Sequence, residues 1–449
     1  MSFGTGLSGL NSASKNLDVI GHNIANANTT GMKAGRAEFA EMYAMALGAA
    51  GGSSGGIGVS VANVAQLFTQ GNIKITGNQL DLAINGSGFF RVRKPASGGQ
   101  GEELYTRNGE FKLDKDGYMV TNQGYRLMGY KTTESGAKDG EDLVEIQFPT
   151  SEGVAPRRTG GHPDPTQQGL FLNLNLDADA PVFSAPDYGP NADGVLVWAP
   201  ETTPFSGPLT QEMRRYGTSV SVYNSVGTEK QLQIYFVKTQ DDGSGAYSWN
   251  VLTSTDGNEY KTLGVISFDA SGQLIGQKGT TTGSTVLDNV ELTIGGETVS
   301  FPLKFGGAAG GGITQYSGGY SLYNIAQDGY KRGDLASINF GEDGVILVRY
   351  TNGVSLAKGM VGLANFRNVQ GLEPVNGGYW RETFASGEVI SGSPQQGGLG
   401  LLRQNALEES NVDLTQELVN MIVAQRHYQA NAQTIKTQDQ VQQTLVNLR

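Results

Sequence analysis

Three histidines, His22, His162 and His427, are the side chains best suited to proton transfer or metal binding near neutral pH. None of them lies in a His-Glu-x-x-His pattern or in another spacing typical of a metal site. His22 and His427 lie in the two segments of the chain with helical periodicity, so a metal pair or a proton-sensitive contact between them is one interpretation. Polar histidines on a surface or interface are the simpler interpretation, which we favour.

Three short motifs resemble functional sites, but each has a simpler structural explanation. Asp114-x-Asp116-Gly117 resembles the start of a calcium loop, but Met119 stands where an EF-hand needs glycine, which predicts a hairpin turn instead. Arg332-Gly333-Asp334 matches an adhesion tripeptide, and in a glycine-rich chain a turn is the default interpretation. The glycine run 306–312 lacks the Gly-Lys-Ser/Thr ending of a phosphate loop.

No catalytic, metal-binding or cofactor-binding residues are therefore predicted, and we expect a protein that is not an enzyme. The sequence has no Gly-x-Ser-x-Gly elbow, and no acid/base pair is distinguishable among its many carboxylates. The absence of cysteine excludes disulfides and thiol catalysis. One other class of protein stays open at this point, a secreted β-rich adhesin or hydrolase.

The composition is acidic and rich in glycine. The net charge is −11, and residues 147–325 hold most of it, with seventeen acidic and nine basic residues. An acidic chain gains little from nucleic acid or from anionic membranes, so neither is an expected partner. No apolar run is long enough to span a membrane, and Met1-Ser2-Phe3-Gly4 lacks the features of a cleaved signal peptide. The 66 glycines predict many short strands joined by turns.

The first 25 residues predict a helix with a seam for packing against other helices. Steps of four and three residues, typical of coiled coils, relate the members of this seam. The small residues in it are expected to allow close helix approach. Asn26 to Gly31 then ends the helix. The seam consists of Leu7, Leu10, Ser14, Leu17, Gly21 and Ile24.

The last 45 residues predict a second, longer helix. Asn411 or Asp413 is suited to cap its start, and neither glycine nor proline occurs from Gln404 onward. A helix of about 35 residues cannot bury its apolar stripe alone, so it needs a partner. The two helices either pair within one chain or meet copies of themselves. The second seam consists of Leu407, Leu414, Leu418, Met421, Tyr428, Ala432 and Ile435.

Between the helices, short alternating apolar segments separated by turns predict antiparallel β structure. The predicted fold is α+β and mainly β, with paired terminal helices and nested antiparallel β domains between them. A Gly/Ser/Ala segment at 48–58 is expected to be a flexible hinge. The predicted regions are a helical core (1–30 and 404–449), a connector (31–71), an inner β domain (72–146 and 326–403) and an inserted outer β domain (147–325).

Four segments carry a resemblance to a known family. They are Ser8–Lys33, Gln70–Val92, the Arg107-Asn108-Gly109-Glu110-Phe111 block, and the tail from Ala406 (ALEESNVDLTQELVNMIVAQRHYQANAQTIKTQDQ). Together they resemble the bacterial flagellar rod and hook proteins over roughly the first 130 and the last 130 residues. Matches of this length at both ends, in order, are far more specific than a short motif.

Within that family, the hook subunits are the better match, because rod subunits lack a central insertion of this size. The segment Ser219–Gly227 also resembles the opening of the hook subunit's outer domain. The resemblance implies a structural subunit that assembles with itself into a hollow, bendable helical tube, which transmits torque between rod and filament as a universal joint. A distal rod component is the alternative.

The resemblance also implies partners and a location. The partners would be the distal rod, the hook cap, the hook–filament junction proteins and the flagellar type III export apparatus. The location would be the extracellular hook, which the chain would reach without a cleaved signal peptide. From the heptad patterns we further expect the two apolar stripes to stay unburied in a lone molecule.

Overall fold

The computed structural model describes residues 3–43, 56–95, 101–148, 153–183, 188–190, 196–198, 209–239, 248–257, 260–278, 286–306 and 312–447. These residues form two compact units. The first unit comprises Met1–Ser151, Leu335–Arg349 and Ser355–Arg449, and the second comprises Glu152–Asp334 and Tyr350–Val354. The second unit therefore ends later than the predicted insertion at 147–325, and it also takes in a short segment from the tip of a hairpin.

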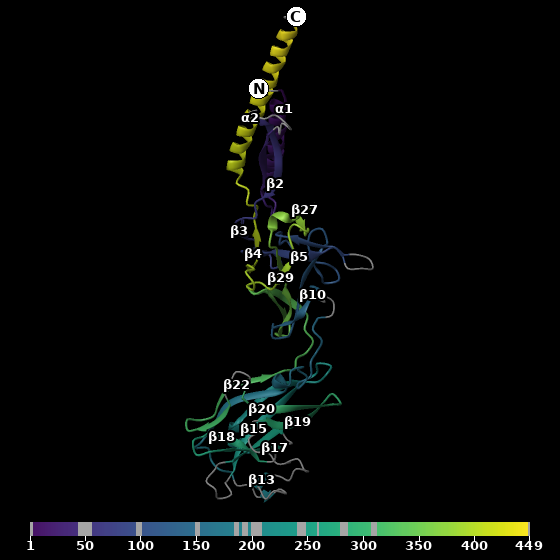
Figure 1. The fold of residues 1–449 in the computed structure, drawn as a ribbon. Helices are drawn as coiled ribbons and strands as arrows, with labels where there is room; N and C mark the ends of the chain where they lie inside the picture. The colour runs from purple at the N-terminus through teal and green to yellow at the C-terminus, as the bar shows by residue number, and fades with distance from the viewer. Residues whose placement is uncertain are drawn as a thin grey trace. The chain divides into compact units, whose positions relative to one another are not determined.

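Two long helices and one hairpin make up the terminal arm of the first unit. The helices are α1 (Phe3–Ala25) and α2 (Leu414–Asn447), and the hairpin pairs β1 (Gly35–Tyr43) with β2 (Gly56–Gln66). Figure 1 shows α1 beside α2, with both chain termini toward the same end of the arm. The prediction of paired terminal helices is confirmed.

The hairpin corrects the prediction that residues 31–71 are only a connector. Its two antiparallel strands pack along α1, and they are the part of the arm that the sequence did not reveal. Most of the expected hinge at 48–58 lies outside the described residues, and its last residues, 56–58, begin β2. The glycines at the C-terminal end of the expected hinge, Gly56 and Gly58, therefore belong to a strand. Gly58, with φ +136°, lies where a side chain would collide with Ser8 of α1.

The remainder of the first unit is β structure. Two short antiparallel pairs join early strands to late ones, β3 (Ile73–Ile75) with β31 (Ala406–Glu408) and β4 (Leu82–Asn85) with β30 (Leu401–Gln404). A 13-stranded sheet follows. Along its main path run β23 (Leu335–Phe340), β24 (Val345–Tyr350), β25 (Ser355–Val361), β9 (Arg126–Thr132), β5 (Phe89–Arg93), β6 (Glu103–Thr106), β28 (Tyr379–Arg381) and β27 (Glu373–Val375).

Shorter strands branch from that sheet, and aromatic residues fill its core. Phe89 contacts Trp380 and Phe366 edge to face, with ring centroids 5.4 and 6.1 Å apart respectively. The branches are β7 (Lys112–Leu113), β8 (Met119–Val120), β10 (Lys138–Glu145), β26 (Leu363–Asn365) and β29 (Ile390–Gly392), and a 3-10 turn, η3 (Val369–Gly371), precedes β27.

The second unit packs two five-stranded sheets around one apolar core, which includes Leu172, Ile234 and Trp249. One sheet contains β19 (Val286–Ile294), β20 (Glu297–Phe305), β11 (Leu170–Asp177), β21 (Ile313–Tyr316) and β22 (Ser321–Gln327). The other contains β14 (Gly217–Tyr223), β15 (Glu229–Thr239), β16 (Ser248–Ser254), β17 (Lys261–Phe268) and β18 (Leu274–Lys278). The pair β12 (Tyr188–Pro190) and β13 (Leu196–Trp198) and the turns η1 (Pro165–Gln167) and η2 (Met213–Arg215) complete it.

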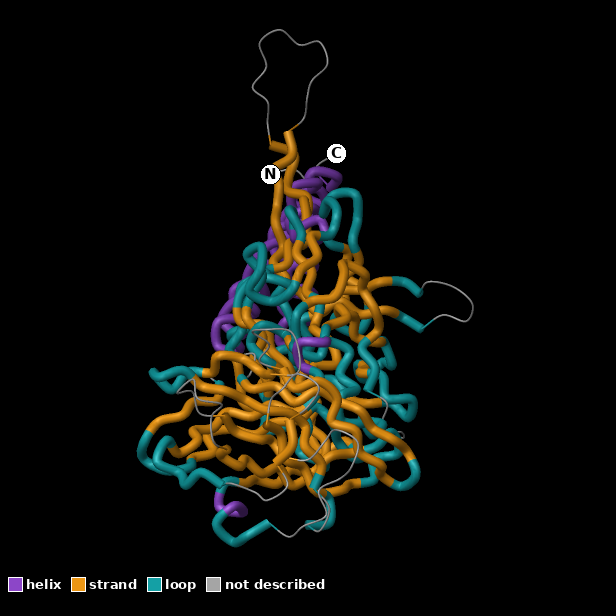
Figure 2. The backbone as a smooth tube through the Cα atoms, turned by 90° about the horizontal axis from the view of Figure 1, so that it is seen from below, coloured by secondary structure: helices purple, strands orange, loops and turns teal. Residues whose placement is uncertain are grey.

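The β structure is not antiparallel throughout. Strand β11 pairs in parallel with β20 and with β21, whereas β22 pairs with it antiparallel. Parallel neighbours need a long crossover connection, and the whole β14–β18 sheet lies between β11 and β20 in the sequence. Apart from this strand, the predicted mainly β fold with two terminal helices is confirmed, and strands dominate the backbone in Figure 2.

Candidate functional site

The helices of the arm are antiparallel and pack through small residues of α1. A Cβ placed on Gly6 would lie 3.1 Å from Ile435, and one on Gly9 would lie 2.9 Å from the Asn431 side chain. A later residue of α1 therefore contacts an earlier residue of α2, as in an antiparallel pair. By contrast, Gly21 has no atom within 4 Å of an added Cβ, so close helix approach within one chain depends on Gly6 and Gly9.

The face of α1 that is buried within the chain differs from the predicted seam. Ser12, Ala13, Ile20 and Asn23 are its buried residues. Of the seam residues, Leu7 is 45% exposed, and the other five are half-buried, namely Leu10, Ser14, Leu17, Gly21 and Ile24. Helix α1 packs against both α2 and the hairpin. Its buried face therefore differs from the one that packing against a single helix would bury.

Helix α2 has an apolar stripe that no part of the chain described by the structure covers. Ala424, which is 1% exposed, marks the buried face. At 3.6 residues per turn, the stripe lies on the other side of the helix from Ala424. Its members are 42 to 52% exposed, and they are Leu414, Leu418, Val419, Ile422 and Val423. We call these five residues the outer stripe.

The predicted seam of α2 divides between these two faces. Leu414 and Leu418 belong to the outer stripe, and Tyr428 is 37% exposed. Met421, Ala432 and Ile435 are half-buried. The expectation of wholly unburied stripes is thus corrected: the helices cover each other in part, and one side of α2 stays bare.

Leu407 was wrongly assigned to the second helix. It lies in β31, paired with Lys74 of β3, because the helix begins only at Leu414. Asn405, with φ +59°, turns the chain between β30 and β31, so the seven-residue spacing back to Leu407 is a coincidence. Residues 404–413, predicted as helical core, are therefore strand and turn. Asp413 caps the helix, accepting hydrogen bonds from the backbone N–H groups of Thr415 (2.9 Å) and Gln416 (3.1 Å).

The structure also separates the two helical histidines, which are both exposed. The contacts of Gly6 with Ile435 and of Gly9 with Asn431 set the register of the antiparallel pair. Extending that register places His22 and His427 about nine residues apart along the helices, or roughly 13 Å at 1.5 Å per residue. They therefore form neither a metal pair nor a direct contact within one chain.

A buried ion cluster lies where the arm meets the β structure of its unit. The carboxylate of Glu408 accepts from Lys33 Nζ at 2.6 Å and from Arg107 Nη1 at 3.0 Å. The side chains of Lys33, Arg107 and Glu408 are 1%, 6% and 0% exposed. They come from the segment between α1 and β1, from the segment after β6, and from β31.

Backbone groups complete this cluster. Lys33 Nζ also donates to the Thr69 carbonyl (2.8 Å), Arg107 Nη2 donates to the Gly86 carbonyl (2.8 Å), and the Gly71 N–H donates to Glu408 (2.9 Å). Two cations face one carboxylate, so these carbonyl dipoles are needed to balance the excess positive charge. Burial lowers the pKa of the Lys33 ammonium, and the adjacent Glu408 carboxylate opposes that shift.

Two asparagines fix the backbone beside the cluster. Asn23 of α1 exchanges two 2.8 Å hydrogen bonds with the N–H and C=O of Gly35. Asn411 accepts from the Ala34 N–H (2.8 Å) and donates to the Leu67 carbonyl (2.7 Å). Asn411 was one of two residues suited to cap α2, the other being Asp413. Instead it joins the start of the hairpin to its end, and Asp413 alone forms the cap.

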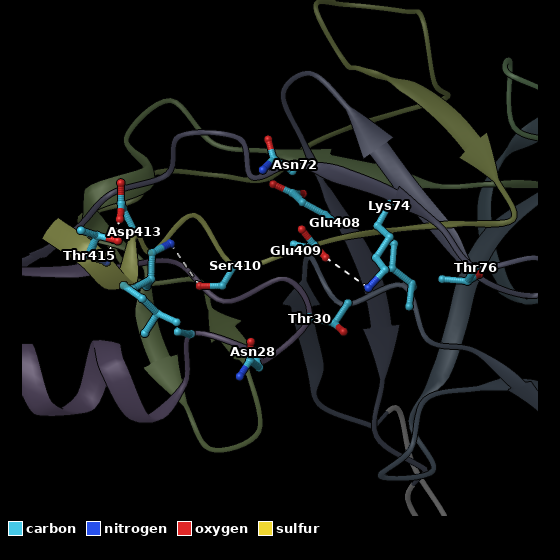
Figure 3. A pocket seen from close by; sticks show the side chains of 14 residues that line it. Asn28, Thr30, Asn72, Lys74, Thr76, Glu408, Glu409, Ser410, Asp413 and Thr415 are labelled. Atoms are coloured by element: carbon cyan, nitrogen blue, oxygen red, sulfur yellow. Dashed lines mark hydrogen bonds and ion pairs between the residues drawn. The ribbon is translucent and has the colours of Figure 1, made fainter. Parts of the chain in front are cut away.

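A pocket of about 630 Å³ opens next to this cluster. The turn after α1, strand β3, the segment after β31 and the first turn of α2 surround it. Figure 3 shows Lys74 and Glu409 paired across one wall, at 3.6 Å, and Ser410 beside the backbone that leads to Asp413. Leu407, Val412 and Leu414 add apolar surface to a lining that is otherwise mostly polar.

Of the short motifs, Asp114–Gly117 has the role that the sequence favoured. Asp114 Oδ1 accepts from the N–H groups of Asp116 (2.9 Å) and Tyr118 (2.7 Å), and Gly117 has φ +80°, which is a hairpin turn between β7 and β8. The turn expected at Arg332–Asp334 is not found, because Gly333 pairs with Val154 in an isolated antiparallel bridge. Most of the glycine run 306–312 lies outside the described residues.

The described residues contain neither a candidate metal site nor a helix that could cross a membrane. They contain no group of three or more His, Cys, Asp or Glu residues positioned to hold a metal ion. No described helix is long and apolar enough to cross a membrane.

The chain matches four family models in order. They are "Flagella basal body rod protein" (residues 3–33), "Flagellar hook protein FlgE/F/G D1 domain" (83–156), "Flagellar basal body protein FlaE D2 domain" (191–330) and "Flagellar basal body rod FlgEFG protein C-terminal" (403–448). The flagellar hook protein FlgE of Escherichia coli K12 is 38% identical over 456 residues, with 100% of both chains covered. The chain belongs to the flagellar hook protein family. FlgE of Borreliella burgdorferi is 32% identical, with 99% of this chain and 98% of that protein covered.

A solved hook protein has a related fold. The crystal structure of Helicobacter pylori flagellar hook protein FlgE2 matches 75% of this chain and 100% of its own, with a TM-score of 0.51 and 16% identity. At that identity the likeness concerns the fold alone. The third and fourth family models also assign the insertion and the α2 region of this hook-family chain to known hook and rod modules.

Proposed function

We propose that the chain is the structural subunit of the bacterial flagellar hook, and that copies of it assemble through their terminal arms into a hollow, bendable tube. The observation that carries this proposal is the outer stripe, five neighbouring apolar residues left bare on α2. Contiguous exposed apolar surface of this kind marks a site of association. The hairpin on the same arm also exposes apolar side chains, namely Phe39, Met42, Val61 and Val64.

The physics of these surfaces suits a tube that bends while it turns. Apolar contacts are non-directional, so they survive small changes of spacing between neighbouring copies. Head-to-tail contacts between different surfaces extend into a helical assembly, whereas contacts between identical patches close into a dimer. The buried cluster of Lys33, Arg107 and Glu408 would then pass force from the arm to the β structure without slippage.

The same proposal assigns a place and partners. The subunit would lie in the extracellular hook between rod and filament, transmit torque as a universal joint, and contact distal rod, cap and junction proteins at its ends. It would leave the cell by the flagellar type III route and perform no enzymatic reaction. The full-length likeness to hook proteins, including the insertion, disfavours the distal rod alternative.

Polymerisation of a charged variant tests the proposal. Leu418, in the outer stripe and 51% exposed, would be changed to Asp, with Val226→Asp, at an exposed apolar residue of the second unit, as the matched control. We expect Leu418→Asp to abolish tube formation, seen by electron microscopy, while circular dichroism shows unchanged β structure. Val226→Asp should still form hollow, curved tubes. Normal tubes from Leu418→Asp would refute the role of the outer stripe, and straight rigid rods from the unchanged chain would favour the rod alternative.

A further inference from the structure

Two features of the first unit are left unfilled or uncovered by the part of the chain that the structure describes. One is the pocket beside the start of α2. The other is Phe384, whose side chain is 105% exposed, more than any other large apolar residue that the structure describes. A phenylalanine held entirely in water costs free energy that burial in a partner would recover. Aromatic anchors that fill pockets supply much of the energy at protein interfaces.

The turn that carries Phe384 is rigid. The Thr383 N–H donates to Ser386 Oγ at 3.0 Å, and the Ala385 N–H donates to Thr383 Oγ1 at 3.1 Å. Ser386 is fully buried, and Thr383 Oγ1 donates to the Gly371 carbonyl at 2.5 Å. An anchor held in place before binding loses little conformational freedom on binding. The geometry is that of a presented side chain rather than of a frayed loop.

Both features lie where the arm joins the β structure. The Ala385 carbonyl accepts from Asn368 Nδ2 at 3.0 Å, and the neighbouring Gln370 donates to the Gln66 carbonyl, at the end of β2, at 2.7 Å. The pocket lies between the turn that follows α1 and the first turn of α2. The anchor and the pocket are therefore on the same end of the unit, built from different segments.

We propose that Phe384 of one copy inserts into this pocket on the next copy of the chain. The inference rests on the proposed function, since in an assembly of identical subunits the neighbour of an outward-facing residue is another copy. Leu407, Val412 and Leu414 would contact the ring, and the pocket of about 630 Å³ leaves room for the flanking turn. Leu414 is also the first residue of the outer stripe, so the pocket continues the surface proposed for assembly.

An anchor and a pocket on one chain make a contact between unlike surfaces. Such a contact leaves a free anchor at one end and a free pocket at the other, so it extends instead of closing at two copies. The polar rim of the pocket, with Asn72, Lys74 and Ser410, offers hydrogen-bonding partners to the backbone of the incoming turn. This polarity distinguishes the pocket from the outer stripe, which offers only apolar contact.

The absence of cysteine from the natural sequence gives a direct test. Ala385→Cys, which places the thiol beside the anchor and keeps the Phe384 ring, and Ser410→Cys would be combined in one chain, assembled, and exposed to a mild oxidant. We expect a ladder of disulfide-linked dimers, trimers and longer species, because each contact leaves two further ends free. Tyr323→Cys combined with Ser410→Cys is the matched control from another exposed residue and should give no ladder. A ladder from the control, or none from the first pair, would overturn the inference.

A second measurement uses side-chain chemistry instead of cross-linking. Phe384→Ala should raise the protein concentration needed for assembly about tenfold, whereas Phe384→Leu should raise it much less. An unchanged critical concentration for Phe384→Ala would contradict the inference. If the unchanged chain forms no assembly, the proposed function fails and takes this inference with it. If tubes form without the ladder, this inference alone is overturned.

Discussion

The ammonium of Lys33 and the carboxylate of Glu408 lie 2.6 Å apart, although 375 positions separate them in the sequence. Both are out of contact with water, and Arg107 adds a second cation to the same carboxylate. This pairing connects the segment that follows α1 to the strand that precedes α2. The position of the terminal arm on its β structure therefore depends on residues from both ends of the chain.

Removing the carboxylate should loosen that junction. Glu408→Gln leaves two buried cations without a counter-charge, and breaking a buried pair in this way costs about 3–5 kcal/mol. Amide exchange should show faster opening at residues 31–35 and 69–71, with the second unit unaffected. The control is Glu409→Gln, which removes the exposed partner of Lys74 and should cost under about 1 kcal/mol. Equal effects from the two variants would show that burial of the pair does not matter.

Two glycines of α1 should respond in opposite ways to alanine. Gly21→Ala adds a methyl group to open space inside a helix, so it should stabilise the arm by about 0.5–1 kcal/mol. Gly9→Ala gains the same helix propensity but places its methyl group against the Asn431 side chain. Its gain should be smaller or reversed. Amide exchange within α1 measures both, and a larger gain for Gly9→Ala would argue against the antiparallel register of α1 and α2.

The cap of α2 should depend on the Asp413 side chain. Asp413→Ala removes the acceptor of two backbone N–H groups and should cost about 1 kcal/mol, seen as faster exchange of the amides of Thr415 and Gln416. Asp413→Asn keeps an acceptor oxygen and should lose only a fraction of that stability. If both variants behave like the unchanged chain, the helix start is fixed by the neighbouring strand pair and not by its cap.

Tyr320 should make the second unit sensitive to alkaline pH. Burial raises the pKa of its hydroxyl to about 12, and that hydroxyl has no hydrogen-bond partner among the residues that the structure describes. Between pH 10 and 12 the unfolded state therefore holds fewer protons than the folded state, so the free energy of unfolding falls as pH rises. Tyr320→Phe should weaken this fall, because it removes the titrating group.

Denaturant unfolding of the second unit at pH 9, 11 and 12 measures the effect of Tyr320→Phe. At pH 9 the variant should be at least as stable as the unchanged chain, since no hydrogen bond is lost. Other tyrosines with a raised pKa, such as Tyr216, are present in both proteins. Both proteins should therefore keep part of the fall in the free energy of unfolding at high pH. Identical pH profiles for the variant and the unchanged chain would mean that Tyr320 ionises normally.

The arm could be predicted from sequence where spacing is regular. The periodicity of α1 and α2 and the cap at Asp413 all appear in the structure. The hairpin was missed, because β1 and β2 flank a glycine-rich segment and their alternation is weak. Strand β11 has a much clearer pattern, since its four buried leucines alternate at Leu170, Leu172, Leu174 and Leu176. That alternation predicts a strand at this position.

The buried ion cluster and the pocket could not be predicted from the spacing of nearby residues in the sequence. Nothing near Lys33 or Arg107 in the sequence marks Glu408 as their partner, because pairs this distant are set by tertiary contacts. The seven-residue pattern through Leu407 was misleading, since Asn405 turns the chain before the helix begins. The pocket and the exposed Phe384 likewise arise only when separate segments are brought together.

The wide sequence separation of Lys33 and Glu408 has a consequence for unfinished chains. A polypeptide that ends before residue 408 would contain both cations but not the carboxylate that neutralises them, and it would also lack strand β31 and all of α2. Such a fragment could fold its second unit yet have no properly seated arm with which to join a growing polymer. A truncated subunit would therefore lack both the counter-charge at the junction of its arm and the helix that carries the outer stripe.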